Sequence, residues 1–208
     1  MPDETKYPSR ELRDPAELRA LAHPVRLRIL EALAIRGQAT ATQLAEWVDE
    51  SPANCSWHLR QLARYGYIVE AGGGRGRQRP WKIVPRGHRW GERAEPAASA
   101  LALAEDAAAE LVVDLEYAAQ RDWLTRRRGE PETWRQGAFL TQNVAFLTAA
   151  ELAELAEVIN AAVVAHPERL GDPATRPPDA RPIRLVAWGF PSRDPTQGSR
   201  DPNRGSAG

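Results

Sequence analysis

The 208-residue sequence predicts a mainly helical α+β protein, and three features of the chain predict it. Four short amphipathic segments, each with a residue that can cap a helix, crowd into residues 14–66. Two strand-like runs follow them, joined by a glycine-rich turn. A long alanine-rich helix then leads into a second region of mixed helix and strand. The expected domains are residues 14–85 and 96–190, with residues 1–13 and 191–208 as disordered tails.

Composition excludes several classes of protein. The chain is 42% hydrophobic and 27% charged, which is ordinary for a soluble globular protein. Its longest apolar runs fall well short of the roughly 18 residues of a membrane span, and the N-terminus lacks the apolar core of a signal peptide. The only cysteine, Cys55, allows no intramolecular disulfide and no multi-cysteine zinc site. We therefore expect a cytoplasmic protein with no membrane partner.

The four N-terminal helices are predicted from their first and last residues. Asp14, Thr40 and Ser51 are good caps, and prolines 15, 24 and 52 suit first helical positions. Gly37 and Gly66 end the second and fourth helices. The third and fourth helices are separated by only a few residues, which is typical of a helix-turn-helix.

The fourth helix is amphipathic, with an apolar stripe on one side and a polar face on the other. Cys55, Leu59 and Leu62 recur at spacings of four and three, so they should hold the helix to the core, with Cys55 as a small buried hydrophobe. The candidates for contact with DNA bases are the residues that begin the helix or lie off this stripe: Ser51, Ala53, Asn54, Ser56, Trp57, Arg60 and Gln61. For Trp57, contact with DNA and packing inside the domain stay equally open, because an indole has no hydrogen-bond acceptor.

A basic hairpin is predicted directly after this helix. Its tip carries Arg75, Arg77, Gln78 and Arg79 among glycines, and these are candidates for contacts with phosphates or the minor groove. The whole chain has a net charge of zero, yet Ser51 to Arg93 holds nine basic residues against two acidic ones. A polar helix beside a basic hairpin is how a winged helix grips double-stranded DNA.

The same tract resembles a known family. LAHPVRLRILEAL, TATQLAEWV, SPANCSWHLRQLARYGYIVEA and GRGRQRPWKI, in this order, are similar to the winged helix-turn-helix of ArsR-type bacterial transcriptional regulators. Members bind operator DNA as homodimers, so the resemblance implies operator DNA and a second copy of this chain as partners. The third helix lacks the cysteines of metal-sensing members, and His23, His58, His88 and His166 lie in unrelated segments. We expect no metal and no cofactor, while a small-molecule effector stays open.

The long helix after the hairpin offers a dimer interface. Its small and apolar residues alternate at spacings of three and four, which is a heptad pattern, at Leu101, Ala104, Ala108, Leu111, Leu115 and Ala118. Packing against the helix's own domain is the alternative, but a long helix projecting from a small domain favours the interface between two copies.

The C-terminal region is expected to combine a helix with two paired strands. Residues 138–147 and 183–190 are rich in strand-forming residues, and Thr148 and Glu151 can open a helix between them. This region contains no nucleophile elbow, no phosphate-binding loop and no zinc-protease motif, so no catalytic residue is proposed.

Together these features predict a sequence-specific DNA-binding regulator of transcription that acts as a homodimer and is not an enzyme. Two alternatives remain. The winged helix could bind a protein instead of DNA, or it could accompany an enzymatic C-terminal half.

Overall fold

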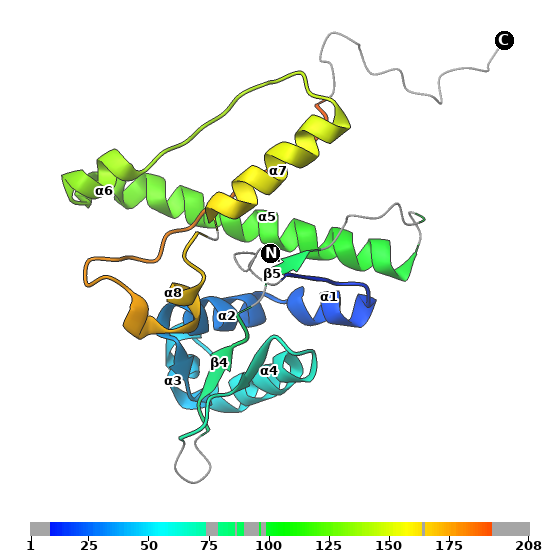
Figure 1. Ribbon diagram of the computed structural model, residues 1–208. Helices are drawn as coiled ribbons and strands as arrows, with labels where there is room; N and C mark the ends of the chain where they lie inside the picture. Colours follow the sequence, from blue (N-terminus) through cyan, green and yellow to red (C-terminus); the bar gives the residue numbers. More distant parts are fainter. Residues whose placement is uncertain are drawn as a thin grey trace, which may run out of the picture.

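The computed structural model describes residues 9–73, 79–85, 87–89, 96, 99–163 and 165–192, which form helices joined by short strands (Figure 1). The strands are β1 (Ser9–Glu11), β2 (Gln38–Ala39), β3 (Ile68–Glu70), β4 (Trp81–Ile83) and β5 (Gly87–Arg89). The α-helices are α1 (Pro15–Leu21), α2 (Pro24–Arg36), α3 (Ala41–Val48), α4 (Pro52–Arg64), α5 (Ala100–Arg126), α6 (Glu132–Gly137), α7 (Ala149–Val163) and α8 (Glu168–Gly171), and two short 3-10 helices are η1 (Arg127–Gly129) and η2 (Pro173–Thr175).

Capping residues begin these helices where the sequence predicts. The side chain of Asp14 accepts a hydrogen bond from the backbone of Ala16 at the start of α1. Thr40 and Gln43 form a reciprocal capping box at the start of α3. At α7, the carboxylate of Glu151 accepts from the backbone N–H of Thr148, 2.7 Å away. Each bond satisfies a backbone donor that the first helical turn leaves unpaired.

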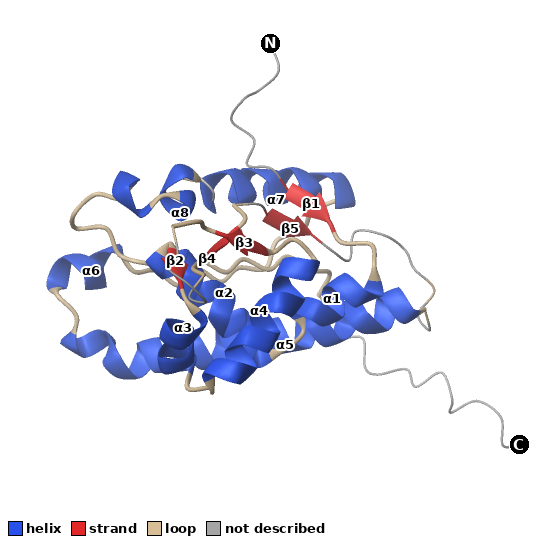
Figure 2. Cartoon of the chain, turned by 90° about the horizontal axis from the view of Figure 1, so that it is seen from below, coloured by secondary structure: helices blue, strands red, loops and turns tan. Residues whose placement is uncertain are grey.

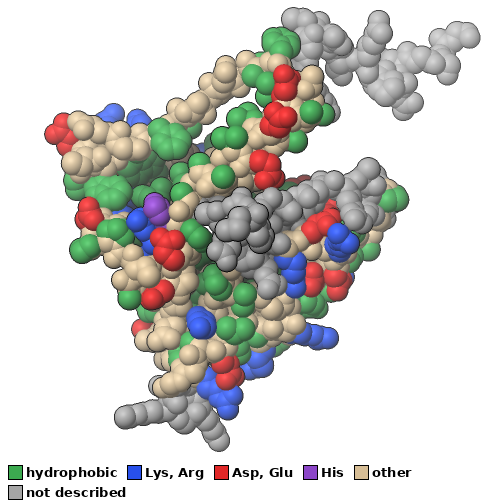
Figure 3. Space-filling model, viewed as in Figure 1, with side chains coloured by type: hydrophobic (Ala, Val, Ile, Leu, Met, Phe, Trp, Pro, Cys, Tyr) green, Lys and Arg blue, Asp and Glu red, His purple; other side chains and the backbone are tan. Residues whose placement is uncertain are grey.

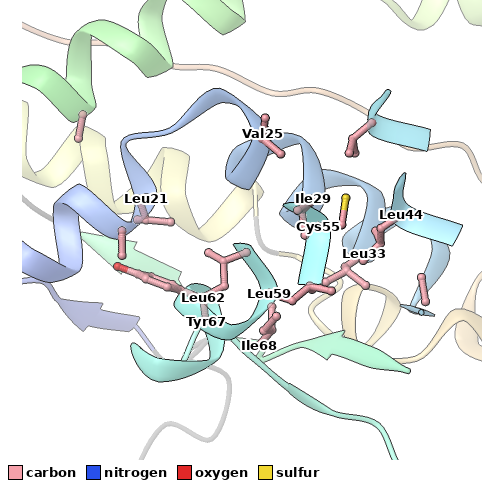
Figure 4. Packing of buried hydrophobic residues seen from close by; sticks show 14 of the residues in the cluster. Leu21, Val25, Ile29, Leu33, Leu44, Cys55, Leu59, Leu62, Tyr67 and Ile68 are labelled. Atoms are coloured by element: carbon pink, nitrogen blue, oxygen red, sulfur yellow. The ribbon is translucent and has the colours of Figure 1, made fainter. Parts of the chain in front are cut away.

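One hydrophobic core joins the N-terminal helices to the strands (Figure 4). Ile29 of α2, Leu44 of α3 and Leu59 of α4 are fully buried and meet in its centre. The stripe predicted on α4 is confirmed, since Cys55, Leu59 and Leu62 are all fully buried. Burial of a leucine side chain contributes roughly 1.5–3 kcal/mol, so this stripe fixes which face of α4 turns outward.

A three-stranded antiparallel sheet in the order β2-β4-β3 holds the predicted hairpin against the helices. Ile68 pairs with Ile83 in the hairpin, and Gln38 of β2 pairs with Lys82 on its other edge. β2 lies between α2 and α3, so the base of the hairpin is attached to the chain that leads into α3 and α4. The hairpin predicted from the sequence is confirmed at its two strands.

The N-terminal segment differs from expectation. Residues 9–13 were expected within a disordered tail, but Ser9–Glu11 pairs in parallel with Gly87–Arg89, seen as a separate strand pair in Figure 2. Leu12 is only 1% exposed, and Arg10 donates a hydrogen bond to the carbonyl of Tyr65. Burial of one leucine, together with a strand partner at residues 87–89, between the two expected domains, orders this segment. Residues 1–8 and 193–208 lie outside the described residues.

α5 packs along α1 through its N-terminal half. Ala104 and Ala108 are 5% and 3% exposed and belong to the same core as the N-terminal helices. Beyond that contact α5 continues to Arg126, and α7 lies on the side of α5 away from α3 and α4 (Figure 1). None of the helices described here is long and apolar enough to cross a membrane.

The C-terminal half contains the predicted helix but not the predicted strands. α7 is present, whereas residues 138–147 and 183–190 are extended segments without strand pairing. Side-chain contacts fix the second segment, because Arg184 pairs with Glu116 of α5 and with Glu31 of α2. A strand needs a neighbouring backbone for its hydrogen bonds, and the described residues supply none to either segment. The α+β class therefore rests on the N-terminal strands.

The segment after α8 docks on the end of α2. The guanidinium of Arg176 donates to the backbone carbonyls of Ala34, at 2.8 Å, and Ile35. Pro173 lies against Gly37, whose φ of +81° ends α2. Carbonyls of a last helical turn lack partners within the helix, and Arg176 satisfies two of them.

Candidate nucleic-acid interface

The start of α4 is fixed by its neighbours. The hydroxyl of Ser51 accepts a hydrogen bond from the backbone N–H of Asn54 at 3.1 Å, and Pro52 occupies the first turn. Asp49 ends α3 with a φ of +54°, a left-handed conformation that Asp tolerates better than most residues. This tight turn sets the angle between α3 and α4, as in a helix-turn-helix.

The face of α4 opposite the core is open. Ser51, Ala53, Trp57 and Arg60 are exposed, and Asn54, Ser56 and Gln61 are partly exposed. In Figure 1, α3 and α4 lie on the side of the molecule away from α7, so the described C-terminal residues leave this face uncovered. The structure thus brings all seven candidates onto one accessible helix: Ser51, Ala53, Asn54, Ser56 and Trp57 lie at its start or in its first half, and Arg60 and Gln61 lie in its second half.

Two of these polar side chains are already hydrogen-bonded to residues in or just before the helix. The amide nitrogen of Asn54 donates to the carboxylate of Glu50 at 2.7 Å, and the Ser56 hydroxyl donates to the carbonyl of Pro52 at 2.8 Å. An amide carries two N–H donors and an acceptor oxygen, so Asn54 keeps groups for a further partner. Ser56 has its donor occupied, which leaves it the weaker candidate.

Arg60 is the freest charged group on this face. It is exposed, and it makes no hydrogen bond or ion pair with any other residue that the structure describes. Arg64, one turn further along α4, instead lies over the ring of Tyr65, with 5.9 Å between the guanidinium carbon and the ring centroid. A free guanidinium offers its whole fork of donors to an incoming acceptor.

Trp57 does not enter the core. Its side chain is 47% exposed, and its ring meets the edge of His58 at 4.8 Å between centroids. The indole therefore covers a buried histidine with one side and presents the other to solvent.

A contact between two histidines, the buried His58 and the partly exposed His23, was not predicted. His23, which caps α2, and His58 of α4 lie 4.6 Å apart between ring centroids, although their segments are distant in sequence. His58 is 2% exposed, and its Nδ1 has no hydrogen-bond partner among the described residues. Burial, then the nearby His23 and Arg26, lower the pKa of His58, and Glu50 opposes them. The one sequence signal was the position of His58, one residue before Leu59 on the buried stripe.

At the hairpin only part of the predicted basic tip falls within the described residues. Arg79 is exposed and forms an ion pair with Glu70 across the hairpin, with 2.9 Å between nitrogen and oxygen. Arg75, Arg77 and Gln78 lie outside the described residues. Arg79 would exchange its partner Glu70 for any phosphate that it binds, so the net gain from that contact is reduced.

Cys55 is the buried hydrophobe that the sequence predicts. It is fully buried, and burial raises the pKa of its thiol, which keeps the sulfur protonated and unreactive. Among the described residues no group of three or more His, Cys, Asp or Glu side chains is placed to hold a metal ion.

The predicted residues on α5 are distributed between the core and the surface. Ala104 and Ala108 lie in the core of the same chain, and Leu101 packs against it. Leu111 and Leu115 are partly buried, and Ala118 is exposed. The first half of this heptad pattern thus serves packing within one chain.

Comparison with known families identifies the N-terminal elements. Residues 21–70 match the family described as "Helix-turn-helix domain". Residues 21–70 form a helix-turn-helix domain. The match extends from the end of α1 through α4 to the end of β3, so it includes the open face of α4. This domain supports DNA binding by the chain.

Comparison with solved structures gives a weaker likeness. The crystal structure of M. tuberculosis Rv0081 is 24% identical over 53% of this chain and 88% of that chain, with a TM-score of 0.30. A TM-score this low carries no conclusion about this chain. No curated protein matches the chain.

Proposed function

We propose that this chain is a sequence-specific DNA-binding regulator of transcription that acts as a homodimer. The observation that carries the proposal is the helix-turn-helix domain at residues 21–70, in which α4 turns an uncovered polar face outward. In this proposal α4 enters the major groove, and the arginine-rich hairpin lies along the backbone or in the minor groove.

Three side chains of α4 suit base contacts in the major groove. Arg60 can donate two hydrogen bonds to guanine. Asn54 can bind adenine with its remaining donor and its acceptor, while Glu50 holds its amide in place. Trp57 offers an exposed apolar edge for a thymine methyl group.

A homodimer would present two copies of α4 to one duplex. Two helices related by a two-fold axis read a palindromic site, with half-sites about 10–10.5 base pairs apart. Dimer contacts on α5 would come from its less buried positions, Leu111, Leu115 and Ala118. A small-molecule effector, if one binds, would act by changing the separation of the two α4 helices.

Selection of bound fragments from genomic DNA by the purified chain tests the proposal. Wild-type protein should enrich a motif with two inverted half-sites. A variant with Arg75, Arg77 and Arg79 changed to alanine should enrich the same motif with weaker binding, and the dependence of log K on log salt should flatten by about one unit for each lost phosphate contact. Failure of the wild type to enrich any motif would overturn the proposal.

A further inference from the structure

The C-terminal half exposes an unusually apolar surface, part of which Figure 3 shows on α7 and the extended chain beside it. Residues 138–147 contribute Phe139, Val144 and Phe146, which are 77%, 76% and 99% exposed. Residues 183–190 contribute Trp188 and Phe190, which are 59% and 75% exposed. We call these two extended segments, together with the exposed side of α7, the C-terminal face.

The exposed aromatic area summed over the two extended segments is large enough for an interface between proteins. An aromatic side chain carries roughly 150–250 Å², so the exposed fractions of its three phenylalanines and Trp188 amount to roughly 450–800 Å². The largest apolar patch on a typical monomer is about 300–600 Å². A stable dimer buries about 800 Å² on each partner, which the aliphatic residues of the same face help to complete.

Within the part of the chain that the structure describes, the backbone of both extended segments also lacks backbone partners. No backbone hydrogen bond joins residues 139–147 or 183–190 to any other described segment. Both have the composition of strands, and an unpaired strand edge is a template for another chain.

Side-chain contacts nevertheless hold the second segment in position. Arg184 bridges to α5 and α2 through Glu116 and Glu31. Arg181 pairs with Glu130 at 2.8 Å, and Gly189 approaches the side chain of Leu152 on α7. The segment is therefore fixed on the molecule while its apolar side chains point outward, as a prepared docking surface would be.

The rest of the chain offers little to cover this face. The residues outside the described structure include only Met1, Tyr7, Trp90 and Val164 as large apolar side chains, and residues 193–208 have none. The face itself is well suited to its own copy. Residues 138–147 and 185–190 carry no charged side chain, so no like charges would meet between these stretches across a two-fold axis. The charges of the face lie on α7, at Glu151, Glu154 and Glu157, and at Arg184, which is already paired with Glu116 and Glu31.

We propose that the C-terminal face is the main homodimer interface, where each copy covers the face of the other and the extended segments find strand partners between chains. This inference rests on the homodimer of the proposed function and locates its contacts on the C-terminal half, beyond the heptad positions of α5. Two helix-turn-helix domains would then project from a shared C-terminal centre.

Sedimentation of the full chain over a range of concentrations tests the interface. Wild-type protein should be a dimer, and Phe146→Asp and Trp188→Asp, made separately, should each raise the dimer dissociation constant by about 30-fold or more. Phe146 is 99% exposed in the monomer, so its replacement removes almost no packing there, and the circular dichroism spectrum should not change. Amide exchange of residues 139–147 and 183–190 should slow as the dimer forms.

Leu103→Asp is the matched control, because Leu103 is 60% exposed on the first turn of α5. It should leave the dimer intact. If Leu103→Asp dissociates the dimer and the two C-terminal variants do not, the C-terminal interface is wrong, while the homodimer itself stands. A wild-type chain that stays monomeric would overturn both the C-terminal interface and the homodimer. If that monomer also floats with phosphatidylglycerol vesicles, a membrane surface covers the C-terminal face instead. The genomic selection described above remains a separate test of DNA binding.

Discussion

At the scale of single residues, the charged groups near α4 differ in what they can offer a ligand. Arg60 is free of partners among the described residues, while Arg79 is held by Glu70 and Arg64 lies over Tyr65. Freedom matters because a guanidinium that gives up an existing partner gains less from a new one. Arg60 should therefore dominate specificity, although the sequence alone ranks it with its neighbours.

Replacement of Arg60 tests this ranking. Arg60→Ala should weaken binding to the selected motif by about 1–3 kcal/mol, or roughly 5–150-fold, and relax the preference for one base in each half-site. Arg64→Ala is the control on the same helix and should change affinity for all sequences alike. Binding curves on the motif and its single-base variants measure both. An unaltered base preference in Arg60→Ala would mean that this side chain does not read bases.

The contact between buried His58 and partly exposed His23 makes stability depend on pH. Burial and the neighbouring His23 and Arg26 lower the pKa of His58 below its ordinary value of about 6.5, so the unfolded chain binds the proton more readily. The stabilising effect of the neutral ring is complete above about pH 6.5 and is lost as pH falls through that value toward the folded pKa. His23 shifts in the same direction, with burial as the main cause.

The midpoint temperature of thermal unfolding should therefore decrease as the pH is lowered from about 7.5 to about 5.5. His58→Leu should reduce this dependence on pH, even if the variant unfolds at a lower temperature at every pH. His166→Gln, which removes an exposed histidine far from His58 in the sequence, is the matched control. Equal slopes in wild type and His58→Leu would show that His58 does not take up a proton on unfolding in this range.

At the scale of elements, one glycine ends α2 and admits the C-terminal segment. A Cβ atom added at Gly37 would lie 2.4 Å from Cγ of Pro173, on a residue whose φ is +81°. Gly37→Ala should lower the free energy of unfolding by about 2–4 kcal/mol, from backbone strain and overpacking together. Gly66→Ala carries similar backbone strain, with a φ of +74°, but meets nothing within 4 Å, so it should cost about 1–2 kcal/mol.

Urea denaturation of both variants measures the difference between them. Pro173→Ala added to Gly37→Ala should recover part of the loss, because it shortens the side chain that the new methyl group meets. Equal losses at Gly37 and Gly66 would mean that Pro173 does not rest on the end of α2.

Elements defined by local chemistry could be predicted from the sequence, and those defined by a distant partner could not. α1 to α4, α5 and α7 begin near recognisable caps, and caps act through hydrogen bonds within one turn. β1 was missed because its partner, β5, lies in a segment that looks like a linker. Residues 138–147 and 183–190 have strand composition, but pairing depends on a backbone that composition does not reveal.

The same distinction applies to the candidate interface. The buried stripe of α4 follows from spacing, so its opposite face could be predicted. The contact between His23 and His58 depends on tertiary placement, so only the structure shows it. The bond from Asn54 to Glu50 is local, but it depends on the side-chain conformation at the turn before α4, which the sequence pattern does not give.

At the scale of the whole molecule, the C-terminal half is joined to the helix-turn-helix domain through α2. Arg176 binds the last carbonyls of that helix, Pro173 rests on Gly37, and Arg184 reaches Glu31. α2 packs against α3 and α4, so whatever positions the C-terminal half also positions α4. A dimer built on the C-terminal face would thereby set the distance between two copies of α4.

Footprinting of the selected DNA site tests the central claim, that two outward faces of α4 read one duplex. Wild-type protein should protect two inverted half-sites whose centres lie about 10–10.5 base pairs apart in the major groove. In Arg60→Ala, protection of both half-sites should be lost together. Protection of a single stretch without two-fold symmetry, or a footprint that Arg60→Ala leaves intact, would contradict it.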